Sequence, residues 1–119
     1  MKPSAAGLRI TEHDGVSRVD FVDRNILDEA NIQQIGEELS KLVESSPRPK
    51  ILICFENVEH LSSAALGVLI TISNGVKGRD GQLRLSDIRP QLLEVFKITR
   101  LDQMFEIHDS ANDAQALFG

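Results

Sequence analysis

Two adjacent serines, Ser62 and Ser63, are the residues of this sequence whose type and position best suit regulated chemistry. They stand between an apolar run, residues 51–55, and a helical pattern of apolar residues that begins at Leu66. A serine hydroxyl readily accepts a hydrogen bond from a free N–H of a first helical turn, so Ser62 is expected to be the N-cap and Ser63 the first helical residue. Because a helix N-terminus favours negative charge, a phosphate on Ser63 would not melt the helix.

The small residues that follow Ser63 indicate that a phosphate on Ser63 would control the binding of a partner protein. Ala64 and Ala65 have almost no side chain, so a partner protein could approach the backbone closely at this point. A phosphate dianion beside them would block that approach. The alternative interpretation is purely structural, because a helix cap alone accounts for a pair of serines.

The segment Leu61-Ser62-Ser63-Ala64-Ala65-Leu66-Gly67-Val68 resembles the phosphorylation loop of STAS domains, the family of bacterial anti-sigma factor antagonists. The usual family pattern is Asp-Ser-Ser/Thr-Gly-Leu-Gly-Val, and alignment on the last three residues places the family's phosphorylated serine on Ser63. The sequence departs from that pattern at Ser62, which replaces an aspartate, and at Ala65, which replaces a glycine. The resemblance extends over about residues 10–116, in the order of elements as well as in this loop.

The resemblance implies a protein switch in bacterial transcription. The unphosphorylated domain would bind an anti-sigma factor that is also a serine kinase, and the sigma factor would be freed. The kinase would then phosphorylate Ser63, with Ser62 as the alternative target because the family's aspartate is missing, and a serine phosphatase would restore the hydroxyl. The expected partner-binding residues are Asp23, Arg24, Asn25, His60, Leu61, Ser62, Ala64, Ala65 and Leu66.

Three of these residues, Asp23, Arg24 and Asn25, are included because of the expected topology. They follow the second expected strand, and the carboxyl ends of adjacent parallel strands share one edge of a sheet. In the family this segment commonly reads Gly-Glu-Leu/Ile-Asp and helps to form the partner-binding face, whereas here residues 23–28 read Asp-Arg-Asn-Ile-Leu-Asp. A polar turn that leads into a capped helix is the alternative interpretation.

The charge of the chain argues against nucleic-acid and membrane partners. Its 119 residues include 13 basic and 18 acidic side chains, which gives a net charge of −5 without a basic run. The N-terminus has no apolar core of signal-peptide length, and the longest apolar stretch, residues 64–72, is too short to span a bilayer. The single cysteine, Cys54, lies in the apolar run and is expected to be a small core side chain, which suits a cytoplasmic protein.

The sequence offers little for an enzymatic site. His13, His60 and His108 have no spacing suited to a metal, and no glycine-rich phosphate loop follows a strand. Glu56 and Glu59 follow the central strand but do not complete the acidic cluster of a phosphate-accepting receiver domain, so we interpret them as loop carboxylates. We therefore expect a binding protein without catalytic residues, metal or cofactor.

Hydrophobic periodicity predicts a hairpin and then alternating helices and strands. Asp14-Gly15 is a hairpin turn signal, and residues 51–55 lack polar alternation, which is typical of a central parallel strand buried on both faces. Ala114, Leu117 and Phe118 are expected on the inner side of the last helix. The expected strands are residues 8–11, 16–21, 51–55, 82–86 and 104–107, and the expected helices start near Asp28, Ser62, Pro90 and Ser110.

This alternation predicts an α/β sandwich with a largely parallel sheet, and the resemblance narrows it to a STAS-like sandwich of about four or five strands with about four helices. Residues 1–7 are expected to form a flexible tail and residues 8–119 a single domain. Two other functions remain open: an unphosphorylated STAS scaffold subunit of a signalling complex, and a sensor that holds a small molecule or nucleotide on the same edge.

Overall fold

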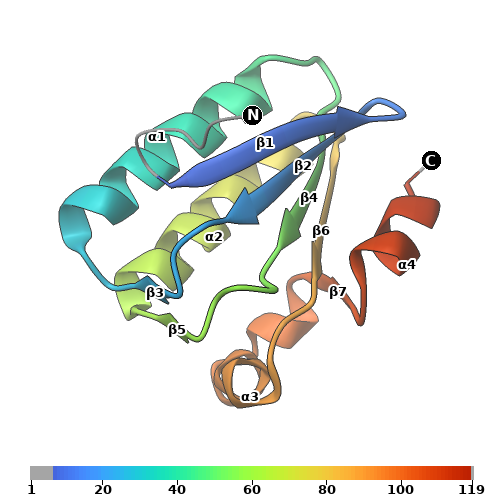
Figure 1. Cartoon of the computed structure of the whole chain (residues 1–119). Helices are drawn as coiled ribbons and strands as arrows, with labels where there is room; N and C mark the ends of the chain where they lie inside the picture. The colour runs from blue at the N-terminus through green and yellow to red at the C-terminus, as the bar shows by residue number, and fades with distance from the viewer. Residues whose placement is uncertain (1–6, 119) are drawn as a thin grey trace.

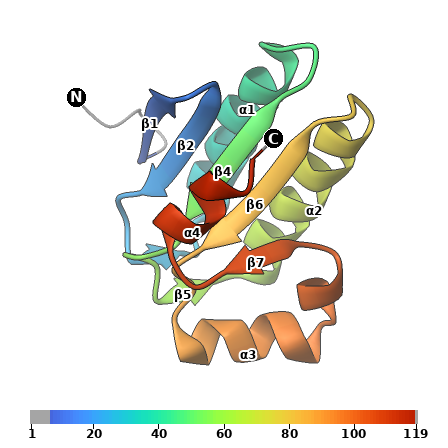
Figure 2. The ribbon, with the colours of Figure 1, turned by 90° about the vertical axis from the view of Figure 1, so that its right-hand side faces the viewer.

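A five-stranded mixed sheet runs through the molecule, and the helices cover its two faces unequally (Figures 1 and 2). The computed structural model describes residues 7–118, so the expected N-terminal tail lies outside the described residues except for Gly7. The sheet has the order β1-β2-β4-β6-β7, in which β1 pairs antiparallel with β2 and every other pair is parallel. Its strands are β1 (Leu8–His13), β2 (Val16–Phe21), β4 (Lys50–Cys54), β6 (Gln82–Ser86) and β7 (Glu106–His108).

The first two strands form the expected hairpin. His13 pairs with Val16, so Asp14 and Gly15 alone make the turn, and both have a positive φ, 52° and 79°. This is the conformation that a two-residue hairpin turn requires and that Asp-Gly tolerates. The hairpin prediction is confirmed.

Strand β4 lies at the centre of the sheet, between β2 and β6. It pairs in parallel with both neighbours, and the residues from Ile51 to Phe55 are all buried. A strand that is covered on both faces has no solvent side on which polar residues could alternate. The prediction of a central parallel strand is confirmed.

One face of the sheet is covered by α1 (Glu29–Glu44) and α2 (Ser63–Lys77), which pack against each other. Asp28 caps α1 through hydrogen bonds that its carboxylate accepts from the backbone N–H groups of Ala30 and Asn31. The large core lies between these helices and the sheet, and α3 (Pro90–Ile98), beyond the carboxyl end of β6, adds Leu92 and Phe96 to it (Figure 2).

Within residues 7–118, α4 (Ala111–Ala116) is the one helix on the opposite face, where it lies against β4, β6 and β7 (Figure 2). Ala114 packs there with Val16 and Leu52 in a second, smaller apolar cluster. The prediction for Leu117 is wrong, since its side chain is 56% exposed. It lies just past the end of a short helix, and it is the next residue, Phe118, that packs against the small cluster.

Two short features differ from the expected elements. The last strand begins at Glu106 instead of 104, because Phe105 follows the 3₁₀ helix η1 (Leu101–Gln103) and packs its ring edge-on against Phe96, with 6.2 Å between centroids. A separate two-stranded sheet, β3 (Asn25–Ile26) with β5 (His60–Leu61), was not expected.

No helix within residues 7–118 combines the length and the apolar character needed to cross a membrane.

Candidate functional site

The small β3–β5 sheet brings the two expected halves of the site together beyond the carboxyl ends of β2 and β4 (Figure 1). Asn25 pairs with His60 and Ile26 with Leu61. The Arg24 carbonyl accepts hydrogen bonds from the N–H groups of Glu59 (2.7 Å) and His60 (3.2 Å). We call this edge, formed by residues 22–28 and 56–64, the Ser63 rim. Its two segments are adjacent because β2 and β4 are neighbours in the sheet.

Ser62 caps α2 as the sequence predicts. Its backbone is extended, with φ −78° and ψ 165°, and its hydroxyl oxygen accepts a hydrogen bond of 3.2 Å from the Ala65 N–H. Its carbonyl accepts from the Leu66 N–H at 3.1 Å. The Ser62 hydroxyl is therefore half-buried and engaged in starting the helix.

Ser63 is the first residue of α2, and its side chain is exposed. Among residues 7–118 the Ser63 hydroxyl has no hydrogen-bond partner. The free N–H groups at the start of α2 lie beside it, together with the positive end of the helix dipole. The geometry therefore presents an unengaged hydroxyl in a place that tolerates negative charge.

The expected partner-binding residues divide by burial. Asp23, Arg24, Asn25, His60 and Ala64 are exposed on the Ser63 rim, and Leu61 is half-buried beside them. Ala65 and Leu66 are only 6% and 8% exposed, because they point into the core between α2 and the sheet. These two residues anchor the helix under the rim, so direct contact with a partner is limited to their exposed neighbours.

The rim also contains residues that the sequence analysis did not select. Leu27 is 53% exposed, immediately before the cap residue Asp28, and Val22 is exposed at the other end of the same segment. The Asn57 side-chain amide donates to the Phe21 carbonyl at 3.2 Å and so ties the loop after β4 to the end of β2. An apolar residue in an otherwise polar turn, as at Leu27, is the signal that could have found this surface.

The charge around Ser63 is mainly negative. The rim segments contain four carboxylates, of Asp23, Asp28, Glu56 and Glu59, and a single arginine, Arg24, so they carry −3 of the chain's net charge of −5. A phosphate on Ser63 would therefore add charge to an already acidic edge, with few cations nearby to neutralise it.

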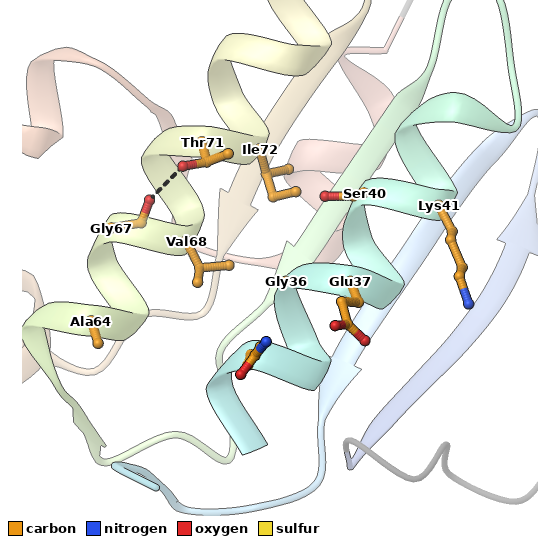
Figure 3. Close-up of a pocket in the computed structure, with 10 residues that line it drawn as sticks. Gly36, Glu37, Ser40, Lys41, Ala64, Gly67, Val68, Thr71 and Ile72 are labelled. Carbon is orange, nitrogen blue, oxygen red and sulfur yellow. Dashed lines mark hydrogen bonds between the residues drawn. The ribbon is translucent and has the colours of Figure 1, made fainter. Parts of the chain in front are cut away.

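A groove runs between the outer faces of α1 and α2 (Figure 3), and one of its lining residues, Ala64, follows Ser63 in the sequence. It has a volume of about 780 Å³, and its wall starts at Ala64. Small side chains keep it open, since Gly36 on α1 and Gly67 on α2 both line it. The Thr71 hydroxyl donates to the Gly67 carbonyl at 3.1 Å, so this polar group is satisfied within the helix.

Cys54 is buried, which confirms that it is a core side chain. Its thiol donates to the Asp87 carboxylate at 3.3 Å, and the Ser86 hydroxyl donates to the same oxygen at 2.8 Å. Burial, with the nearby Asp87 charge, raises the pKa of Cys54 to about 12. Since the thiolate is the reactive form, this cysteine is not a nucleophile near neutral pH.

The three histidines do not form a metal site in the described part of the chain. No group of three or more His, Cys, Asp or Glu side chains within residues 7–118 is placed to hold a metal ion. His13 and His60 are exposed, and the His108 ring lies beside the Arg84 guanidinium, with 3.1 Å between Nε2 and Nη1.

The fold and the position of the serine pair define a known class of domain. The family model described as STAS domain matches residues 8–114, and the chain therefore belongs to the STAS domain family. BtrV of Bordetella bronchiseptica, named as a candidate anti-sigma factor antagonist, is 26% identical over 95 residues, which cover 80% of this chain and 81% of that relative.

Solved structures with the same fold include an anti-sigma-factor antagonist (STAS) domain protein from Planctomyces limnophilus. It matches with a TM-score of 0.80 at 24% identity and covers 90% of this chain and 92% of its own. SpoIIAA of Bacillus, an anti-sigma factor antagonist, matches in its unphosphorylated and phosphorylated forms with TM-scores of 0.70 and 0.69 at 14% identity. These matches cover 92% of this chain and 94% and 96% of the SpoIIAA chains. At these identities the structures establish the shared fold.

Proposed function

We propose that this domain is an anti-sigma factor antagonist, which binds an anti-sigma factor with serine kinase activity and is switched off by phosphorylation of Ser63. The observation that carries the proposal is the exposed and unengaged Ser63 hydroxyl at the start of α2. Support comes from the name of the Bordetella relative and from SpoIIAA, an antagonist of the same fold that exists in a phosphorylated form.

In the unphosphorylated state the partner docks on the Ser63 rim. Ala64 and Gly67 leave the first turns of α2 bare, so a partner can approach the helix backbone closely. Leu27 offers an exposed apolar contact on the neighbouring segment. Asp23, Arg24, Asn25 and His60 surround this surface with polar groups, which is the usual arrangement of a protein interface.

Phosphorylation acts on this contact and leaves the fold unchanged. A phosphate brings about −1.5 to −2 charges near pH 7, and the N-terminal end of α2 accommodates them. The bound partner would have to desolvate that dianion and make room for it. A penalty of about 3 kcal/mol would weaken binding by roughly two orders of magnitude.

The kinase selects Ser63 over Ser62 because of the cap. The Ser62 hydroxyl already accepts the Ala65 N–H and is half-buried, so a phosphate there would remove a hydrogen bond that starts the helix. The kinase supplies its own ATP and magnesium, and a serine phosphatase resets the switch. In this scheme the domain is a cytoplasmic regulatory protein without catalytic residues, and it contacts neither nucleic acid nor membrane.

Mass spectrometry of the modified protein tests this assignment. The serine kinase recovered by pull-down with the parent protein is incubated with ATP, magnesium and the parent, Ser63→Ala or Ser62→Ala protein. We expect one phosphate on Ser63 in the parent and in Ser62→Ala, and none in Ser63→Ala. A phosphate on Ser62 of the parent would move the switch to the cap residue, and an unmodified parent would refute the proposal.

A further inference from the structure

Helix α4 is fixed to the sheet by few buried groups. Its buried residue is Ala114, which packs with Val16 and Leu52 in a cluster separate from the main core. Leu117, just after the helix, is 56% exposed, and Phe118 is half-buried. By contrast, six residues of α2 are buried, and five of them belong to the main core. Figure 2 shows α4 alone on its face of the sheet.

One side chain, Arg84 of β6, connects the C-terminal end of the α4 segment to the sheet. Its Nη2 donates to the Leu117 carbonyl at 3.1 Å, and its guanidinium carbon lies 5.3 Å from the centre of the Phe118 ring. Its Nη1 lies 3.1 Å from Nε2 of His108, in the strand that leads into α4. Because arginine has only donors, the histidine nitrogen must be the acceptor.

The burial of Arg84 strengthens its hydrogen bonds to the α4 segment. Its side chain is only 17% exposed, and its Nε is buried without a hydrogen-bond partner among residues 7–118. A hydrogen bond to a charged group in such a place is stronger than one between neutral groups in water. A second hydrogen bond holds α4 to the hairpin, since Gln115 Nε2 donates to the His13 carbonyl at 3.1 Å.

We propose that α4 opens as an independent unit, with Arg84 as the latch that keeps it closed. A helix of six residues is not stable by itself, so α4 exists only while its contacts with the sheet hold. Local opening is easiest where few apolar side chains are buried, and α4 is such a place. Opening uncovers Val16 and Leu52 on the sheet face and leaves the Ser63 rim intact, because the rim lies at the start of α2 on the other face. The device is thus independent of the proposed phosphorylation.

Native-state hydrogen exchange measured by NMR tests this proposal. The amides of Ala114 and Leu117, which donate within the α4 segment, are compared with those of Leu69 in α2 and Ile53 in β4. We expect the α4 amides to exchange at least about 100-fold faster than the α2 and β4 amides. Arg84→Met, which keeps an apolar stem and removes the guanidinium, should speed the α4 amides by about a further tenfold, because the contacts that it removes exist only while α4 is closed. The amides of Leu69 and Ile53 should speed by no more than this factor, through global unfolding.

Two further variants make the result decisive. Arg79→Met is the matched control, because Arg79 donates to the Ser46 carbonyl at 3.4 Å and that contact lies away from α4, so its α4 exchange should equal that of the parent. Gln115→Ala should speed the α4 amides by less than Arg84→Met. The proposal is overturned if α4 and β4 amides of the parent exchange at the same rate, or if Arg84→Met leaves the exchange of the α4 amides unchanged.

Discussion

Helices α2 and α4 begin with the same local chemistry but are held to the sheet in different ways. Ser62 accepts the Ala65 N–H at 3.2 Å, and Ser110 accepts the Asp113 N–H at 3.1 Å, each through its hydroxyl oxygen. Six residues of α2 are then buried, whereas α4 buries Ala114. The comparison shows that a cap sets where a helix begins, and buried side chains set how firmly it stays.

This difference determines on which helix a phosphate can block docking without unfolding the helix. A phosphate that blocks docking without refolding the domain needs a helix that does not move when the charge arrives. Ser63 lies on such a helix, because Ala65 and Leu66 fix the first turn of α2 to the core immediately beneath it. The same modification at the start of α4 would act on a segment that depends on a small cluster and on Arg84.

The largest difference in the free energy of unfolding between the two regions is expected when a leucine of each is shortened to alanine. Leu69→Ala removes a fully buried side chain of α2 and should lower the free energy of unfolding by about 2–5 kcal/mol. Leu117→Ala shortens an exposed leucine next to α4 and should change it by less than about 0.5 kcal/mol. Urea denaturation followed by circular dichroism measures both. Equal losses would show that α4 contributes to the core as much as α2 does.

A smaller effect on the free energy of unfolding is expected from the ionisation of the Cys54 thiol, on the α4 face of the sheet. The folded-state pKa of Cys54 is raised to about 12 from an ordinary value of 9.0, so the native state keeps a proton that the unfolded chain releases. This term is fully present below pH 9 and is lost as the pH rises toward 12, by up to about 1.4 kcal/mol per pH unit.

The free energies of unfolding of the parent and of Cys54→Ala at pH 8 and pH 10 isolate the Cys54 term. The other groups that titrate in this range are common to both proteins, and the chain has no tyrosine. The parent should therefore lose more stability than Cys54→Ala between the two pH values. Parallel losses would mean that the thiol titrates normally in the folded protein.

The smallest effects are expected from removing the two caps. Ser62→Ala should lower the free energy of unfolding by about 1 kcal/mol, because α2 is part of the main core and loses one hydrogen bond. Ser110→Ala should speed hydrogen exchange in α4, whereas Ser62→Ala should leave α4 exchange unchanged, since α4 opens while α2 stays folded. Thermal denaturation and native-state exchange measure the two responses. Faster α4 exchange in Ser62→Ala would contradict independent opening.

Much of the fold could be predicted because the decisive signals are local. Asp14-Gly15 marks the hairpin, Asp28 and Ser62 mark helix starts, and Pro90 opens α3 as its first residue. The absence of polar alternation around Ile53 identified the central strand. In each case the chemistry of one or a few neighbouring residues fixes the local backbone.

The features that sequence reasoning missed depend on contacts between distant segments. Strands of two residues, such as Asn25–Ile26 and His60–Leu61, are too short to show a period, and their pairing follows from the positions of β2 and β4. The start of the last strand was misplaced because Phe105 is apolar for packing against Phe96. Leu117 fits the helical period, but the helix ends at Ala116, so the period does not hold for the residues after it.

The serine pair of the candidate site was predictable from the sequence, whereas the residues around it were less so. The cap at Ser62 already implied that Ser63 is exposed, and the resemblance pointed to the same hydroxyl. The burial of Ala65 and Leu66 could have been inferred, because they share a helical stripe with Leu69. Leu27 was missed because a single exposed leucine in a turn carries no periodic signal.

The central claim is that adding a phosphate to Ser63 abolishes docking while the domain stays folded. Isothermal titration of the anti-sigma factor into unmodified protein, and into protein phosphorylated to completion on Ser63, tests it most directly, with circular dichroism of both forms as the check on folding. The account predicts at least about 100-fold weaker binding of the phosphorylated form, with the same spectrum. Equal affinity of the two forms would contradict it.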